Sequence, residues 1–110
     1  MKLLNRIRTG RATVSVKIYK LKAHISSNNP QTVLQVVKRF LSGKGDVVLN
    51  GELIEVSAEL EGESAKDLNR ILLSEMRKIE KKTRLRAEWT SNNITERFFD
   101  YVSKSVKESE

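Results

Sequence analysis

The chain has no cysteine, one proline, one histidine and few aromatic residues, namely one Trp, two Tyr and three Phe. Without cysteine it can form no disulfide, no thiolate nucleophile and no cysteine-based zinc site. This pattern fits a reducing compartment, so we expect a cytoplasmic protein. A single histidine leaves little for a transition metal to bind, and we expect no metal and no cofactor.

Long apolar runs are also missing. No run approaches the roughly 18 residues that a membrane-spanning helix requires. The opening segment MKLLNRIRTGR is interrupted by charge too early for the apolar region of a signal peptide. With 110 residues, the chain is long enough for one hydrophobic core. We therefore expect one soluble domain without a membrane partner.

Acidic residues are absent from the first 45 positions, which hold ten Lys and Arg; the first acid is Asp46. The rest of the chain has eleven basic and fourteen acidic residues, and the net charge is +7. Such asymmetry indicates a polyanionic partner, either nucleic acid or an anionic membrane surface. The alternative is a solvated surface without a partner.

Two helices are predicted from capping signals and apolar periodicity. In NNPQTVLQVVKRFLSGKG, Pro30 suits a first helical position and Gly43 follows the helix end. Ser64 followed by Asp67 resembles a capping box at the start of the second helix. Between the helices, Asn50-Gly51 separates two β-rich runs, which predicts a hairpin.

The stretch ATVSVKIYKLKAH, residues 12 to 24, alternates as a strand, but its apolar parity changes between Ile18 and Leu21. This change predicts either a β-bulge near Tyr19 and Lys20, which would turn all the apolar residues toward one face, or two shorter strands. With the bulge, Lys17 and Lys22 would lie on the other face. RLRAEWT alternates too, and its Trp89 is expected to pack against a last helix.

These elements predict an α+β fold, a two-layer sandwich with the ferredoxin-like β-α-β-β-α-β order, an antiparallel sheet and an extra C-terminal helix. We expect a basic N-terminal arm over residues 1–11, the α/β sandwich domain over 12–92 and the C-terminal helix over 93–110. Strand 1 would be central, and one sheet face would be open. The readout of RNA-recognition motifs is not expected, because only Tyr19 supplies an aromatic ring on the central strands.

A partial resemblance covers about half of the chain. The segments LKAHISS, PQTVLQVVKRFL, VVLNGELIEVSAEL and AKDLNRILLSEM resemble the small dimerising subunit of the KEOPS tRNA-modification complex. The resemblance implies a tRNA-associated scaffold subunit without catalytic residues of its own. The chain departs from that family in the reversed order of Asn69 and Arg70, in RLRAEWT and in the predicted terminal helix.

Three candidate sites have simpler interpretations. The acidic run of Glu59, Glu61, Glu63 and Asp67 suits a strand end and a helix N-terminus better than a catalytic or Mg²⁺ site. SGKGD lacks the spacing of a phosphate-binding loop. His24 is expected to be a polar residue near a strand end.

The sequence therefore predicts a non-enzymatic nucleic-acid-binding domain, directed to RNA rather than DNA, that uses phosphate contacts from its basic N-terminal half. The alternative is a dimerising scaffold or regulatory subunit of a protein complex, in which the C-terminal helix would mediate the contact. The predicted nucleic-acid-binding residues are Arg6, Arg8, Arg11, Lys17, Lys20, Lys22, Lys38, Arg39 and Lys44.

Overall fold

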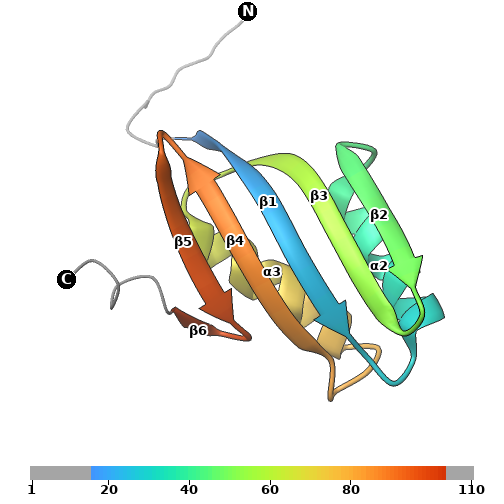
Figure 1. Ribbon diagram of the computed structural model, residues 1–110. Helices are drawn as coiled ribbons and strands as arrows, with labels where there is room; N and C mark the ends of the chain where they lie inside the picture. The colour runs from blue at the N-terminus through green and yellow to red at the C-terminus, as the bar shows by residue number, and fades with distance from the viewer. Residues whose placement is uncertain (1–15, 104–110) are drawn as a thin grey trace, which may run out of the picture.

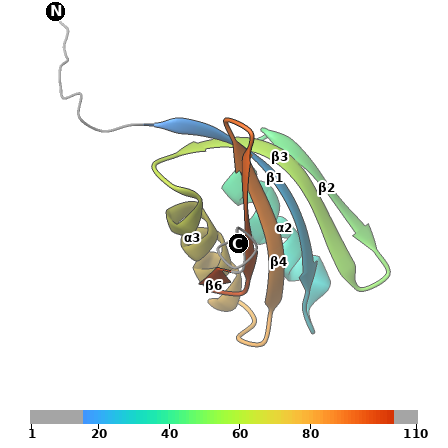
Figure 2. The same ribbon diagram turned by 60° about the vertical axis from the view of Figure 1, so that its left-hand side comes forward.

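The computed structural model describes residues 16–103, which form one antiparallel sheet and two helices. The sheet order is β2-β3-β1-β4-β5-β6. Both helices cover the same face of the sheet, and the other face is open (Figures 1 and 2). The elements are β1 (Lys17–Ser26), α2 (Pro30–Leu41), β2 (Gly45–Asn50), β3 (Leu53–Gly62), α3 (Ala65–Arg77), β4 (Arg84–Ser91), β5 (Ile94–Phe99) and β6 (Val102–Ser103).

The predicted ferredoxin-like fold with an extra C-terminal helix is wrong. The protein is an α+β fold with a six-stranded antiparallel sheet, and residues 94–103 supply strands β5 and β6. Asn92 and Asn93 both have positive φ, 54° and 67°, which a two-residue type I′ hairpin requires and which Asn tolerates. The turn reverses the chain, so β5 pairs with β4 and extends the sheet. Residues 104–110 lie outside the described residues.

The predicted bulge in β1 is also wrong. The strand pairs with β3 without a skipped residue, from Lys17 opposite Gly62 to Ser26 opposite Leu53. Tyr19 occupies the buried position, and its ring meets that of Trp89 edge to face at 6.5 Å. Ile18 is left 59% exposed on the open face. The predicted bulge would have turned Ile18 toward the core. In the structure the ring of Tyr19 lies in the core instead.

The local signals at turns and helix ends are confirmed. Helix α2 begins at Pro30 and ends where Ser42 and Gly43 adopt positive φ. At the start of α3, Ser64 Oγ accepts a hydrogen bond of 3.0 Å from the backbone N–H of Asp67. The β2–β3 hairpin turns at Gly51, whose φ is +68°.

The core lies between the sheet and the two helices, and it contains one buried polar side chain that joins three elements. Trp89 is fully buried and donates from Nε1 to Oδ1 of Asn69 in α3, at 3.1 Å, instead of packing against a terminal helix. The amide Nδ2 of Asn69 donates to the backbone oxygen of Asp100, at 2.7 Å. Asn69 is 1% exposed, so both of its polar groups depend on these two partners.

Asp100 closes the last hairpin against β4. Its carboxylate accepts from the backbone N–H of Leu85 and from Nε of Arg84, both at 2.9 Å. Its own N–H donates to the carbonyl of Leu85 at 2.6 Å. With a φ of +58°, Asp100 turns the chain from β5 into β6. The position of β5 therefore depends on α3, through Asn69, as well as on β4.

We expect Asn69→Ala to lower the free energy of unfolding by about 2 to 4 kcal/mol, because it leaves the Trp89 N–H and the Asp100 carbonyl without their partner. Chemical denaturation measures this loss. Lys66→Ala, on the exposed surface of the same helix, is the control and should change stability by no more than about 0.5 kcal/mol. Equal stability of the two variants would contradict the structural role of Asn69.

Candidate nucleic-acid interface

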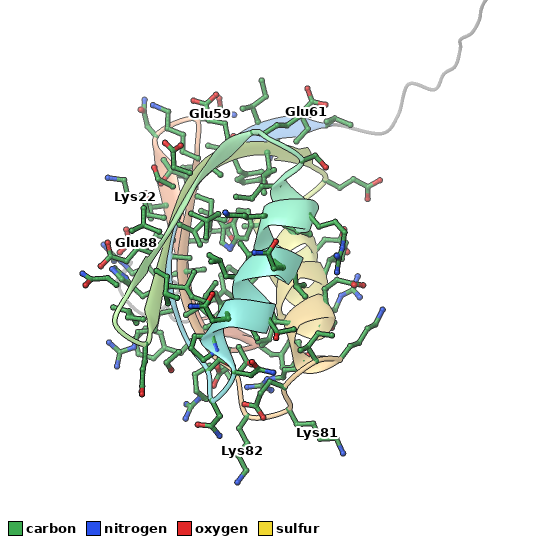
Figure 3. The ribbon with its side chains drawn as sticks, turned by 90° about the vertical axis from the view of Figure 1, so that its right-hand side faces the viewer. Lys22, Glu59, Glu61, Lys81, Lys82 and Glu88 are labelled. Atoms are coloured by element: carbon green, nitrogen blue, oxygen red, sulfur yellow. The ribbon has the colours of Figure 1, made fainter. Side chains whose placement is uncertain are left out.

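The polar residues of β1 from Lys20 onward lie on the open face of the sheet. The strand alternates buried and exposed residues, which places Lys20, Lys22 and His24 opposite to the core. Lys22 lies between Ser57 of β3 and Glu88 of β4 in the register. Lys22 and Glu88 both project away from the helices (Figure 3).

Three lysines from two parts of the chain line one hollow of about 450 Å³ on this face. Lys20 and Lys22 come from β1, and Lys44 comes from the connection between α2 and β2. Ser57 and Glu59 of β3 complete the wall, and we call this site the lysine hollow. Its lysines outnumber its single acid, so the hollow is cationic.

Gly45 brings Lys44 to this place. A Cβ at position 45 would overlap the Cβ of Ala58, so only glycine lets β2 start so close to β3. The carbonyl of Lys44 then accepts the backbone N–H of Glu59 at 3.1 Å. The second glycine of SGKGD therefore serves strand packing and directs a lysine toward the open face.

The structure brings together three of the nine predicted nucleic-acid-binding residues. Lys38 and Arg39 lie in the last turn of α2, on the helix-covered side of the sheet (Figure 2), whereas Lys20 and Lys22 have the parity of the open face. Lys17 has the parity of the buried residues of β1, not that of the open face as expected. Arg6, Arg8 and Arg11 lie outside the described residues, and the chain that carries them enters β1 three residues before Lys20.

Acidic side chains on the open face do not neutralise the lysine hollow. Glu88 pairs with Arg97 of β5, at 3.1 Å. Neither Lys20 nor Lys22 forms an ion pair with any residue of 16–103, although Glu59 faces Lys20 in the register. The ammonium groups thus remain available to an anionic ligand.

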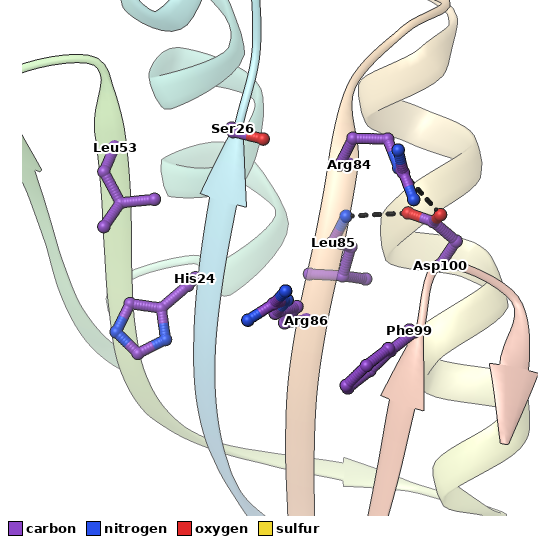
Figure 4. Close-up of a pocket in the computed structure, with 8 residues that line it drawn as sticks. All are labelled: His24, Ser26, Leu53, Arg84, Leu85, Arg86, Phe99 and Asp100. Carbon is purple, nitrogen blue, oxygen red and sulfur yellow. Dashed lines mark hydrogen bonds and ion pairs between the residues drawn. The ribbon is translucent and has the colours of Figure 1, made fainter. Parts of the chain in front are cut away.

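A second hollow, of about 560 Å³, lies toward the other end of β1 (Figure 4). His24, Arg86 and Phe99 lie side by side on β1, β4 and β5, and all three line it. The guanidinium of Arg86 lies over the Phe99 ring, 5.1 Å from its centre. Arg84 lines the same hollow and is held by Asp100.

Sequence reasoning did not find this second group as a site, because Phe99 was assigned to a helix. Two signals were present. Ile94 to Phe99 is rich in β-branched and aromatic residues, and it follows an Asn-Asn pair. Read as a strand, that segment places Phe98 in the core and Phe99 on the opposite face, as the structure has them.

The acidic candidate residues do not gather into a metal-binding cluster among residues 16–103. The backbone N–H of Asp67 donates to Oγ of Ser64 at the helix start, and the carboxylate of Asp67 forms an ion pair with Arg70. Within residues 16–103, no three His, Asp or Glu side chains gather in a way that would hold a metal ion. Neither of the two described helices is long and apolar enough to span a membrane.

Comparisons of the chain with protein-family models, with curated proteins and with solved structures gave no match. The resemblance to the small KEOPS subunit therefore stays a hypothesis based on the sequence segments alone.

Glu59 is the one acid in the lysine hollow, and its removal tests whether the hollow holds anions. If the hollow holds phosphate groups, Glu59→Gln should tighten binding of a nucleic acid at low salt roughly two- to fivefold, because a nearby repulsion is lost. Fluorescence anisotropy with a labelled oligonucleotide measures the change. Glu52→Gln, in the turn between β2 and β3, makes the same charge change outside the hollow and should have no comparable effect. If Glu59→Gln and Glu52→Gln tighten binding equally, the gain comes from the net charge of the domain and not from the lysine hollow.

Proposed function

We propose that this domain binds nucleic acid, RNA in particular, by placing phosphate groups on the lysine hollow. One observation carries the proposal: Lys20, Lys22 and Lys44 converge on one hollow and have no ion-pair partner among residues 16–103. Ammonium groups that are not already paired gain most from a phosphate. Each contact also releases counterions from the nucleic acid, which favours binding at low salt.

The basic segment before β1 supports the same site. Arg6, Arg8 and Arg11 precede Lys20 by 9 to 14 positions, and the chain joins the sheet beside the hollow. Lys38 and Arg39 do not belong to this surface, because they lie in the helix layer. The proposed interface is therefore smaller than the one predicted from the sequence.

The proposal contains no catalytic step. Phosphate contacts supply affinity and position a nucleic acid, but they carry no sequence information. Among residues 16–103, no His lines the lysine hollow and Glu59 is the only carboxylate that does. We assign this site to binding alone.

The salt dependence of RNA binding tests the proposal. Replacing Lys20, Lys22 and Lys44 together with Gln should lower the slope of log K against log salt by about two units on single-stranded RNA, since each lost contact accounts for roughly 0.7. The matched control replaces Lys66, Lys81 and Lys82 with Gln, three exposed lysines outside the hollow. Lys81 and Lys82 lie at the end of the molecule opposite to Glu59 (Figure 3).

The control variant should keep the wild-type slope, because it loses the same charge elsewhere. Wild-type protein that binds neither RNA nor DNA at low salt would refute the proposal. Equal slopes for the two triple variants would place binding outside the lysine hollow.

A dimerising scaffold subunit is the second candidate, and an edge strand favours it. β2 lies at one edge of the sheet, and its Val48 is 55% exposed. An edge strand can pair with the same strand of a second copy. The predicted contact through a C-terminal helix is not retained, because residues 94–103 form strands.

Light scattering distinguishes the two candidates. Under the first proposal we expect a monomer mass across a wide concentration range, with a shift only when RNA is added. A dimer mass that is independent of RNA would favour the scaffold.

A further inference from the structure

The hollows on the open face form one continuous path. The lysine hollow shares Lys22 and Ser57 with a hollow of about 270 Å³. That hollow shares Lys22 and His24 with a third, of about 370 Å³. The third shares His24, Arg86 and Phe99 with the large hollow of about 560 Å³. From Lys20 to Ser26 this path follows β1 for about 20 Å, at roughly 3.3 Å per residue.

Three side chains with flat groups cross the path where its third hollow meets the large hollow. Neighbouring strands are about 4.8 Å apart, so His24 and Phe99, which flank Arg86 in the register, lie on strands about 10 Å apart. An imidazole, a guanidinium and a phenyl ring therefore stand in one row, which we call the planar row. Flat groups of these kinds are the ones on which proteins stack unpaired bases.

The large hollow also offers donors for a phosphate. The guanidinium of Arg86 forms no ion pair and donates no hydrogen bond to any residue of 16–103, so its N–H groups are available for a phosphate or a base edge. Arg84 is held in place by the carboxylate of Asp100, which offsets its charge. Ser26 adds a hydroxyl to the wall of the hollow.

We propose that the planar row, formed by His24, Arg86 and Phe99, binds a base of a single-stranded nucleic acid. The phosphate of that nucleotide would contact Arg86 and Ser26, and the strand would continue along the path toward the lysine hollow. The inference rests on the proposed function and narrows its ligand to unpaired strands. A duplex has its bases paired and stacked, so it can offer phosphates to the lysine hollow but no base to the planar row.

The first test compares single-stranded RNA with duplex RNA of the same sequence. Phe99→Leu combined with His24→Ala removes two flat groups and retains an apolar side chain on β5. We expect it to weaken binding of the single strand at least about fivefold, since one stacked base contributes about 1 to 3 kcal/mol. Binding of the duplex should change less than about twofold, and the salt slope should stay as in the wild type.

The control for this test is Ile94→Ala, which removes another exposed apolar side chain from β5 outside the planar row. It should bind both RNAs as the wild type does. The stacking site is refuted if the double variant binds the single strand as tightly as the control does. It is also refuted if the affinity of the double variant falls by the same factor for the single strand and the duplex. Circular dichroism of each variant checks that it is folded.

The second test examines the planar row without the long-range electrostatics of a polymer. Adenosine 5′-monophosphate, adenosine and ribose 5-phosphate are titrated into ¹⁵N-labelled protein. We expect the nucleotide to shift the amide signals of His24, Arg86 and Phe99, adenosine to shift them more weakly, and ribose 5-phosphate to have little effect. Equal shifts with ribose 5-phosphate would indicate phosphate binding alone and would overturn base stacking.

The two tests separate failure of this inference from failure of the proposed function. Salt-dependent RNA binding without a response at the planar row leaves the lysine hollow as the interface and refutes the stacking site. The protein could instead show shifts with the nucleotide but bind no RNA chain of greater length. That result would support a nucleotide site at the planar row and refute the proposed function.

Discussion

The position of β5 in the sheet, and with it the position of Phe99 on the open face, depends on one buried amide. Asn69 is enclosed between α3 and the sheet, where an unpaired polar group is costly, so its two hydrogen bonds fix Trp89 and the Asp100 carbonyl relative to α3. Asp100 in turn holds the backbone of Leu85 and the side chain of Arg84. The register of β5 on β4, which puts Phe99 beside Arg86, is thus maintained from the core side of the sheet.

The sequence predicted those parts of the fold that depend on local chemistry. Pro30 and Ser64 mark helix starts and Gly51 a hairpin, because each residue satisfies a backbone requirement within a few positions. The predicted C-terminal helix was wrong because the apolar residues of that segment fit both the helical period and the strand period. Ile94 and Phe98 are spaced as on a helix face and also share one face of a strand, and pairing with β4 decides in favour of the strand.

The candidate site was predictable only in part, for the same reason. Strand alternation is enough to place Lys20 and Lys22 on one face once Tyr19 is accepted as a core residue. The position of Lys44 depends on the register of β2 on β3 and on the close approach at Gly45, neither of which a single segment reveals. Charge alone gave nine candidate cations, whereas register and layer bring three of them into one hollow.

The remaining acids of the open face bear on selectivity. Glu55 and Glu59 flank β1 on the β3 side, whereas Glu88 is engaged with Arg97. If the domain binds RNA as proposed, a phosphate chain that follows the path meets Lys20, Lys22 and Lys44, and it also passes Glu59 in the lysine hollow and Glu55 in the next hollow. Like charges at these positions repel phosphates that approach them, so favourable contacts are confined to the positions of the lysines. A mixed face would then restrict the register in which a single strand binds, because each phosphate must reach a lysine and avoid a carboxylate, which a uniformly basic face of the same net charge does not require.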